Sequence, residues 1–183
     1  MEAHKGEGRI ITVEYERFFV VGSYVPNSGM KLERLAYRTE QWDEDLRTYL
    51  AALATRKPTM LLGDLNVAHL DIDIYNVQSK HVAKSAGTTP QERASFGELL
   101  GRGWVDGFRH LHPSATGCYT YWSVRAGNRA TNRGLRLDYC VLSDGLTKTA
   151  GEGLRLHDCW ILDKATVGAS DHCPVGVALA GLV

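Results

Sequence analysis

The feature that most constrains the fold of this chain is a long amphipathic segment that leads directly into a short apolar one. Between about residues 32 and 55, apolar side chains recur every three or four positions with charged residues between them, which predicts a helix with one buried face. Lys57-Pro58 ends this pattern, and residues 59–62 read as a short buried strand. A helix followed by a buried strand is typical of layered α/β proteins.

The rest of the chain continues this alternation. Residues 8–15 and 17–24 are β-rich runs joined tightly around Glu16, which predicts a hairpin. Thr89-Pro90-Gln91-Glu92 predicts a helix start with a capping box, and that helix should run to Leu100. We therefore expect a single α/β domain over residues 1–183, with residues 1–8 flexible, a polar loop at 71–87, and further strands at 118–123, 136–143 and 175–179.

Composition excludes several classes of protein. Lys plus Arg and Asp plus Glu number 21 each, so any attraction to nucleic acid would need a local basic face. No apolar stretch approaches the roughly 20 residues that span a bilayer, and the polar first residues lack a signal-peptide core. The four cysteines include no C-x-x-C pair, which favours buried free thiols over a zinc site.

Two polar side chains follow the apolar run at residues 59–62. Asp64 and Asn66 come directly after Gly63, which allows the chain to turn. A carboxylate there can bind Mg²⁺ or orient water, and a neutral amide can hydrogen-bond a phosphate oxygen without repelling it. The same two residues could instead only form an Asx-turn at a strand end. Both interpretations stay open from the sequence.

A second carboxylate and imidazole lie near the C-terminus, in Asp171-His172. Histidine suits proton transfer near neutral pH, and it needs a carboxylate to fix its tautomer. Asp138 is the candidate, because it lies in an apolar run where a carboxylate is costly without a partner. The alternatives are a plain polar loop around His172 and a structural salt bridge from Asp138 to an arginine.

An arginine-rich segment precedes Asp138. It contains two asparagines and two glycines as well as its arginines, a composition that suits contact with a phosphate backbone, although an ordinary solvated loop would look the same. The aromatic run before it could line a pocket or pack in a strand core. The arginines are Arg125, Arg129, Arg133 and Arg136, and the aromatic residues are Tyr119, Tyr121 and Trp122.

Taken together, these segments resemble the exonuclease III-type apurinic/apyrimidinic (AP) endonucleases of the endonuclease/exonuclease/phosphatase superfamily. The resemblance extends from about residue 8 to residue 179. It implies the C-terminal portion of a four-layer α/β sandwich, with two packed mixed β-sheets flanked by helices. The motifs that carry it are Tyr24-Val25-Pro26-Asn27, Gly63-Asp64-Leu65-Asn66-Val67-Ala68-His69, Thr89-Pro90-Gln91-Glu92-Arg93, Arg136-Leu137-Asp138-Tyr139 and Ser170-Asp171-His172-Cys173-Pro174.

The resemblance implies a DNA base-excision repair enzyme that hydrolyses the phosphodiester 5′ to an abasic site, with Mg²⁺ or, as a substitute, Mn²⁺. A 3′-exonuclease or 3′-phosphodiesterase activity is a further activity that the resemblance implies. His172 would activate the water with Asp138 beside it, Asp64 would handle the water or leaving-group proton, and Asn66 would hold a phosphate oxygen. The implied sets are catalytic Tyr24, Asp64, Asn66, Asp138 and His172; metal-binding Asp64, Asn66, Asp171 and His172; DNA-binding Asn27, Arg125, Arg129, Arg133 and Arg136; and an abasic pocket of Tyr121, Leu135 and Leu137.

The chain departs from the family pattern at its front. Family members begin with a strand that carries an Asn, followed by a Gln-Glu motif whose Glu is a principal Mg²⁺ ligand, but no Gln-Glu pair precedes Tyr24 here. We therefore expect an N-terminally truncated domain with weak or no activity alone, and a complementing N-terminal half as a partner beside abasic duplex DNA. Relatives imply an intracellular location, nuclear in a eukaryote and otherwise cytoplasmic. The alternative functions are a related metal-dependent phosphodiesterase or phosphatase, and a non-catalytic DNA-binding fragment.

Overall fold

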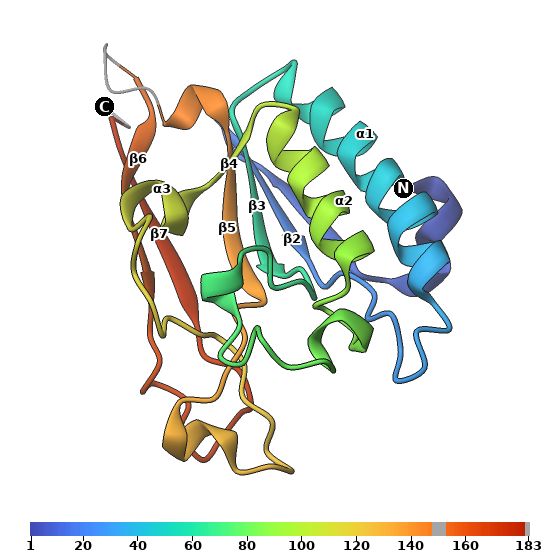
Figure 1. Ribbon diagram of the computed structural model, residues 1–183. Coiled ribbons are helices and arrows are strands. Elements are labelled where there is room, and N and C mark those ends of the chain that lie inside the picture. The colour runs from blue at the N-terminus through green and yellow to red at the C-terminus, as the bar shows by residue number, and fades with distance from the viewer. Residues whose placement is uncertain (148–152, 182–183) are drawn as a thin grey trace.

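The chain forms a layered α/β structure. The computed structural model describes residues 1–147 and 153–181, and every element below lies in these ranges. A five-stranded sheet is covered on one face by helices α1 (Asp43–Ala54) and α2 (Pro90–Gly101), and a two-stranded sheet packs on its other side (Figure 1). The expected arrangement of two packed sheets flanked by helices is therefore confirmed.

The larger sheet is mixed, and its strand order brings separate motifs together. The predicted hairpin is confirmed, because β1 and β2 pair antiparallel, whereas β2 and β3 run parallel. β5 pairs antiparallel with β3, and this register sets Asp64 directly opposite Asp138. In spatial order the strands are β1 (Ile10–Glu14), β2 (Phe19–Ser23), β3 (Thr59–Asp64), β5 (Asp138–Ser143) and β4 (Trp104–Asp106).

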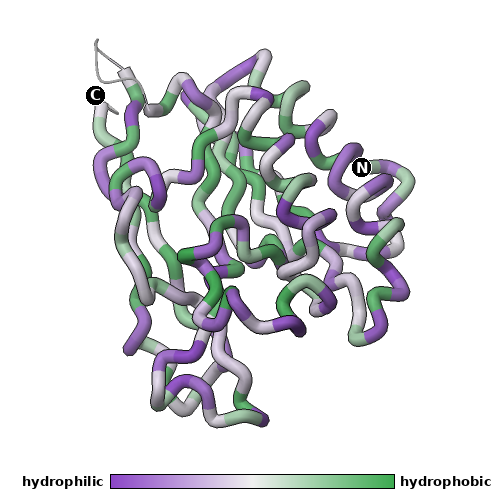
Figure 2. Tube along the Cα trace, viewed as in Figure 1, coloured by the Kyte–Doolittle hydropathy of each residue, from purple (hydrophilic) through white to green (hydrophobic). Residues whose placement is uncertain are grey.

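The helical layer follows the predicted pattern with one difference. The helix predicted between residues 32 and 55 is present, but it enters α1 through a wider π-helical turn, Tyr37–Trp42. α2 starts as predicted, because the Thr89 hydroxyl accepts the Glu92 backbone N–H while the Glu92 carboxylate accepts the Thr89 N–H at 3.1 Å. Figure 2 shows how the apolar stretches of the central strands lie between the layers.

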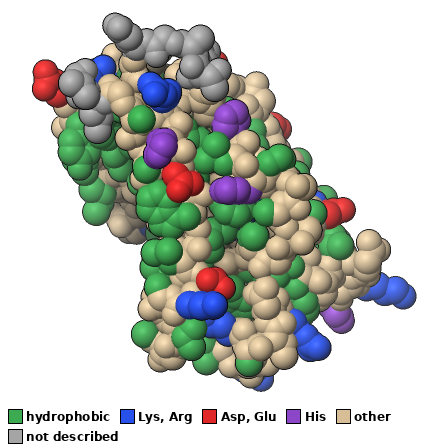
Figure 3. Space-filling view, turned by 90° about the vertical axis from the view of Figure 1, so that its left-hand side faces the viewer, with side chains coloured by type: hydrophobic (Ala, Val, Ile, Leu, Met, Phe, Trp, Pro, Cys, Tyr) green, Lys and Arg blue, Asp and Glu red, His purple; other side chains and the backbone are tan. Residues whose placement is uncertain are grey.

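The smaller sheet consists of β6 (Arg155–Ile161) and β7 (Val175–Ala180), paired antiparallel, with the short helix α3 (Gly107–Leu111) packed near β6. β7 confirms the strand predicted at 175–179. The strand predicted at 118–123 was wrong: Tyr121 makes only isolated bridges to Leu135 and His172. Figure 3 views the molecule from this side, where apolar side chains are spread widely with few charged ones between them.

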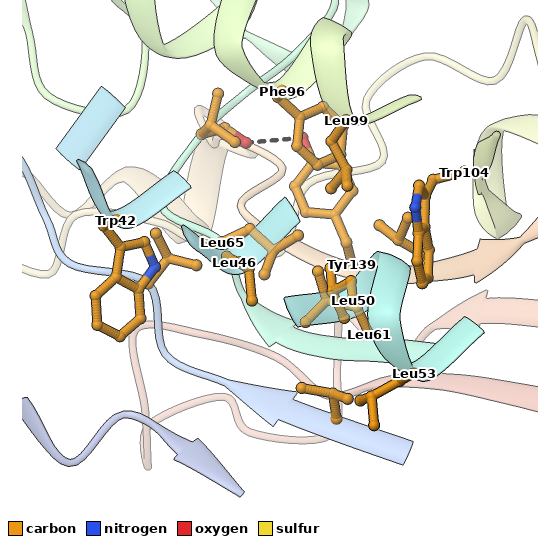
Figure 4. Packing of buried hydrophobic residues seen from close by; sticks show 14 of the residues in the cluster. Trp42, Leu46, Leu50, Leu53, Leu61, Leu65, Phe96, Leu99, Trp104 and Tyr139 are labelled. Carbon is orange, nitrogen blue, oxygen red and sulfur yellow. Dashed lines mark hydrogen bonds between the residues drawn. The ribbon is translucent and has the colours of Figure 1, made fainter. Parts of the chain in front are cut away.

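The main core lies between the helices and the larger sheet (Figure 4). Leu50 of α1 and Leu61 of β3 are fully buried, and Tyr139 of β5 closes the core with its hydroxyl donating to the Val67 carbonyl at 2.7 Å. Fully burying one such side chain stabilises the fold by roughly 1.5–3 kcal/mol. This core fixes β3 and β5, the two strands that carry Asp64 and Asp138.

The N-terminal residues have regular structure, and their flexibility stays a prediction. Glu2–Glu7 form a 3₁₀ helix, and the His4 ring is buried between the Tyr37 hydroxyl at 2.8 Å and the Asp45 carboxylate at 2.9 Å. These two partners hold the segment against the helical layer. No helix within residues 1–147 and 153–181 is long and apolar enough to cross a bilayer. All four cysteines are free, and Cys140, Cys159 and Cys173 are buried.

Candidate active site

The expected pairing of Asp138 with His172 is present. Asp138 begins β5 and His172 lies just before β7, and the His172 Nδ1 is 2.7 Å from an Asp138 carboxylate oxygen. Because a carboxylate accepts hydrogen bonds, Nδ1 carries the proton and Nε2 is left to take one from another group. Thr120 supports both sides: its hydroxyl accepts the Asp138 N–H at 3.0 Å, and its carbonyl accepts the Cys173 N–H at 2.8 Å.

The surroundings of His172 favour its charged form. Burial opposes protonation of the ring, but the hydrogen bond and the charge of Asp138 outweigh it. The nearby carboxylates of Asp64 and Asp171 act in the same direction, so the pKa of His172 is raised above 6.5. A half-buried imidazole with these neighbours is well suited to accept a proton near neutral pH.

Asp64 ends β3, and its pKa lies above that of a surface carboxylate. Burial, and then the charge of Asp138 across the ladder, raise the pKa of Asp64 to about 6, against the stabilising N–H of Asn66. Gly63 makes this close approach possible: at its φ of +132°, an added Cβ would lie 2.2 Å from the Ser23 carbonyl oxygen. Asp64 can therefore both hold and release a proton near neutral pH.

Asn66 is held in a left-handed backbone conformation, with φ of +47°. Its N–H donates to Asp64 at 2.8 Å, which is the Asx-turn that the sequence left open. Its side-chain amide donates to the Val25 carbonyl at 2.9 Å and to Asp64 at 3.2 Å. The remaining Asn66 oxygen accepts from the Asn27 side chain at 2.9 Å. The Asx-turn is therefore present, and the functional role of Asp64 and Asn66 stays a prediction.

Two other predicted site residues, Tyr24 and Asp171, have exposed side chains. Tyr24 follows β2, and its 55% exposed side chain lies under the Arg9 guanidinium, 4.8 Å from the ring centre. The Asp171 side chain is exposed. Within the described ranges, no group of three or more His, Cys, Asp and Glu side chains could hold a metal ion. Asp64, Asn66, Asp171 and His172 stay a predicted set of metal ligands.

The three predicted pocket residues are brought together beside His172. Tyr121, Leu135 and Leu137 belong to one apolar cluster, and the Tyr121 ring centre is 5.0 Å from that of His172. Tyr121 and Leu135 also line a cavity of about 200 Å³. Their role as an abasic pocket stays a prediction.

The arginine segment divides into exposed and structural members. Arg125 and Arg133 are exposed, and the segment of residues 125–133 lies at the lower end of the molecule in Figure 1. Arg129 instead donates to the carbonyls of Asp163 at 2.5 Å and Ser170 at 2.8 Å, and its guanidinium lies 4.5 Å from the centre of the Trp122 ring. Most of its donors are thus used to hold the loop that precedes His172.

The prediction that Arg136 contacts DNA was wrong. It is 1% exposed and donates to Asp73 at 2.8 Å and to Asp106 at 2.6 Å, and Arg109 donates to the same Asp73 carboxylate. A buried guanidinium needs such partners, because an unpaired charge in the interior is very costly. Arg136 therefore belongs to an internal ion network that the sequence had not predicted.

Two further supporting residues were missed. Arg38 is 2% exposed and bonds to the loops around Asn66, and Thr120 holds Asp138 in place. A signal for Arg38 was available, because it lies three residues after Leu35 and four before Trp42, on the apolar face of the predicted helix. No comparable signal marked Thr120.

Comparison with known proteins decides the family. The model of the endonuclease/exonuclease/phosphatase family matches residues 2–172. The chain belongs to this family. It is 44% identical, over 96% of its length, to a DNA-(apurinic or apyrimidinic site) endonuclease of Dictyostelium discoideum, and covers 46% of that protein. It is 45% identical to an exodeoxyribonuclease of Bacillus subtilis over 96% of this chain and 65% of the relative. The chain thus spans about half to two thirds of these two relatives.

Solved structures agree with this family assignment. An AP endonuclease from Leishmania major superposes with a TM-score of 0.79 at 34% identity, covering 93% of this chain and 54% of that one. A 3′ phosphatase from Neisseria, solved with a product DNA hairpin, also gives 0.79, at 28% identity, over 94% of this chain and 65% of that one. The resemblance to exonuclease III-type AP endonucleases, an enzyme family, is therefore confirmed.

Proposed function

We propose that this chain carries the proton-transfer part of an AP endonuclease site, which hydrolyses the DNA phosphodiester 5′ to an abasic nucleotide. The observation that carries the proposal is the Asp138–His172 pair at 2.7 Å, with Asp64 opposite Asp138 in the ladder and its pKa at about 6. A base and a group able to give a proton thus lie at one end of the sheet, as this hydrolysis requires.

Each side chain then has a distinct part. His172 Nε2 takes a proton from the attacking water, and Asp138 stabilises the imidazolium that forms. As water oxygen bonds to phosphorus, the bond to the leaving 3′ oxygen breaks, and the neutral form of Asp64 protonates that oxygen. The products are a 3′-hydroxyl and a 5′-phosphate on the abasic side.

The phosphate donor differs from the one expected. Both amide hydrogens of Asn66 are used within the protein, by Val25 and Asp64. Asn27 donates one amide hydrogen to Asn66 and keeps the other for a phosphate oxygen. We therefore assign the phosphate contact to Asn27 and the orientation of Asn27 to Asn66. Tyr24 remains a candidate contact at the leaving-group side.

A divalent cation, Mg²⁺ with Mn²⁺ as a substitute, remains part of the proposal. Asp64 and Asp138 face each other across the ladder, an arrangement that suits a cation, and carboxylate and amide oxygens are the ligands Mg²⁺ prefers. The described residues supply only part of such a site. The candidate ligands stay Asp64, Asn66, Asp171 and His172, and the steps above belong to the side chains alone.

A complementing N-terminal half is also part of the proposal. Ile11 and Val13 of β1 are 72% and 43% exposed, and β7 pairs only with β6 within the described ranges. Exposed apolar side chains beside an unpaired strand edge are typical of a surface that is covered by another element. The relatives, of which this chain spans about half, are long enough to supply that cover.

The DNA-facing surface is smaller than the sequence suggested. Arg125 and Arg133 remain exposed and, with Asn27, are the proposed contacts to abasic duplex DNA. Because Arg136 is buried and most donors of Arg129 are occupied, the structure gives little support to a chain that only binds DNA. A DNA repair role would place the protein with the genome, in the nucleus or the bacterial cytoplasm.

The test is incision of a duplex that carries one tetrahydrofuran abasic analogue, with Mg²⁺ or with EDTA, by the chain alone and with the N-terminal half of a relative. His172→Ala should lower the rate about 10²–10⁴-fold, because it removes the base. The matched control is His157→Ala, an exposed histidine on β6. Equal rates for the two variants, or equal cleavage of undamaged duplex, would contradict the proposal.

A further inference from the structure

Arg38 joins two loops of the candidate site from inside the protein. It lies in the π-helical turn, is 2% exposed, and directs its guanidinium at backbone carbonyls. It donates to Leu65 at 2.7 Å and Asn66 at 3.1 Å, in the loop after β3, and to Pro26 at 3.2 Å, in the loop after β2. One side chain therefore spans the two loops that carry Asn66 and Asn27.

The charge of Arg38 is balanced without using the site carboxylates. Its Nε donates to Asp43 at 3.1 Å, and Glu92 lies 3.9 Å from its guanidinium. The fully buried Glu92 in turn accepts the Ser28 hydroxyl at 2.5 Å. The loop around Asn27 is thus held on one side by Arg38, through the carbonyl before Asn27, and on the other side by Glu92, through the residue after it.

Arg38 and Asn27 also hold the turn at Asn66. Its left-handed backbone is one that asparagine tolerates better than most residues other than glycine, so these contacts fix a conformation the residue can adopt. Arg38 holds the carbonyl of Asn66, while Asn27 bonds to its side-chain oxygen at 2.9 Å. The planar guanidinium offers donors in several fixed directions, which the point-like ammonium of a lysine cannot reproduce.

We propose that Arg38 is a positioning residue, which sets the Asn27–Asn66 amide pair for phosphate contact by bridging the two loops and without touching DNA. The value of this pair for catalysis rests on the proposed function. The effect of Arg38 on the geometry of the pair does not, so the two can be tested separately.

The first test is the NMR spectrum of side-chain amides in the ¹⁵N-labelled chain. In Arg38→Lys, the signals of the Asn27 and Asn66 amides should shift, because the bridge between their loops is lost. The matched control is Arg47→Lys: Arg47 is 5% exposed on α1 and bonds to Glu44 and Ser95, so it contacts neither loop and reaches Arg38 only through Ser95 and Asp43. Its variant should leave the two amide signals in place.

The second test is the kinetics of incision of the tetrahydrofuran duplex. Arg38→Lys should lower kcat about 100-fold, as expected for a small displacement of positioned groups, with KM little changed. Arg47→Lys should retain kcat even if its melting temperature falls as much as that of Arg38→Lys. Should Arg38→Lys not fold, Asp43→Asn removes the negative charge of the Nε partner and should shift the same amide signals by less.

Unchanged amide signals in Arg38→Lys, or equal shifts in Arg47→Lys, would overturn the role of Arg38. Shifted amide signals in a chain that incises no abasic duplex, even with the N-terminal half, would support the positioning role and contradict the proposed function instead.

Discussion

Two charged clusters begin two residues apart in the chain, at Arg136 and at Asp138, and they have opposite character. Around Arg136 the charges balance, because two arginines, including Arg109, meet the buried carboxylates of Asp73 and Asp106. Around Asp138 they do not, because two carboxylates, Asp138 and Asp64 directly across the ladder, share His172 as a neighbour, and His172 bonds to Asp138. The first cluster is closed to solvent, whereas Asp64, Asp138 and His172 are only partly buried.

The pKa shifts express this difference. Burial acts to raise the pKa of Asp73 and of Asp64 alike. Hydrogen bonds and charges from Arg136 and Arg109 reverse the effect at Asp73, so its pKa falls below 3.8, whereas the neighbouring Asp138 adds to it at Asp64. The presence of a buried arginine thus separates a carboxylate that stabilises the fold from one that is poised to exchange a proton.

The largest expected effect on stability is at the balanced cluster. Arg136→Met should lower the free energy of unfolding by about 3–5 kcal/mol, because it leaves buried Asp106 without its arginine and Asp73 with Arg109 alone. Arg133→Met, at an exposed position in the same segment, should change it by less than about 0.5 kcal/mol. Urea unfolding measures both. Similar small values for the two would show that the balanced cluster is not a structural element.

A smaller effect is expected where Thr120 supports the functional cluster. Thr120→Val keeps the side-chain shape but removes the acceptor for the N–H groups of Leu137 and Asp138, at 2.9 and 3.0 Å. Leaving buried donors unsatisfied should cost about 1–3 kcal/mol and displace Asp138, so incision should fall as well. Thr120→Ser keeps the hydroxyl and should retain both the stability of the fold and the rate of incision. Full incision by Thr120→Val would show that Thr120 is not needed to position Asp138.

The smallest effect should have the opposite sign. Asp64→Asn removes a carboxylate that faces Asp138, so in EDTA at pH 7 it should stabilise the fold by about 1 kcal/mol. In the incision assay with Mg²⁺, the same variant should be inactive. Because the pKa of Asp64 is raised to about 6, its stabilising contribution is present at low pH and is lost as the pH rises from about 4 to 6. The stability of Asp64→Asn should not show this decrease between pH 4 and 6.

Asp73 should show the reverse dependence on pH. Its lowered pKa means that its contribution is present above 3.8 and is lost as the pH falls further. Urea unfolding across pH 3 to 7 compares the two windows, with the exposed Asp163→Asn as control. A destabilised Asp64→Asn at pH 7 would mean that the functional cluster is not under electrostatic strain.

The repeating patterns of the sequence predicted the larger elements, because periodicity needs several residues to show. The hairpin, α1, α2 and β7 all follow from such runs. β4 has three residues and α3 has five, too few to show a period. β6 has a register shift between Leu156 and Asp158, which interrupts the alternation that marks a strand. Short and irregular elements were therefore the ones missed.

The contact between Asp138 and His172 was predicted from the chemistry of the two residues, although they lie 34 positions apart, whereas the partners of Arg136 were missed. Asp138 and His172 were expected to pair because each alone would be costly or unoriented. Arg136 resembled Arg125 in the sequence, and only Asp73, more than sixty positions away, distinguishes its buried role. Long-range partners of this kind cannot be inferred from local pattern.

The strand order also has a consequence for biosynthesis. β3 has β2 on one side, but its other neighbour, β5, leaves the ribosome only after the whole stretch from Leu65 to Leu137 has been made. Until then one edge of β3 stays open, and pairing over so long a separation is slow and exposed to misassembly. The two ends that must meet last include Asp64 and Asp138, which repel each other as the ladder closes. A nascent chain of this design should depend on chaperones until residue 143 has emerged.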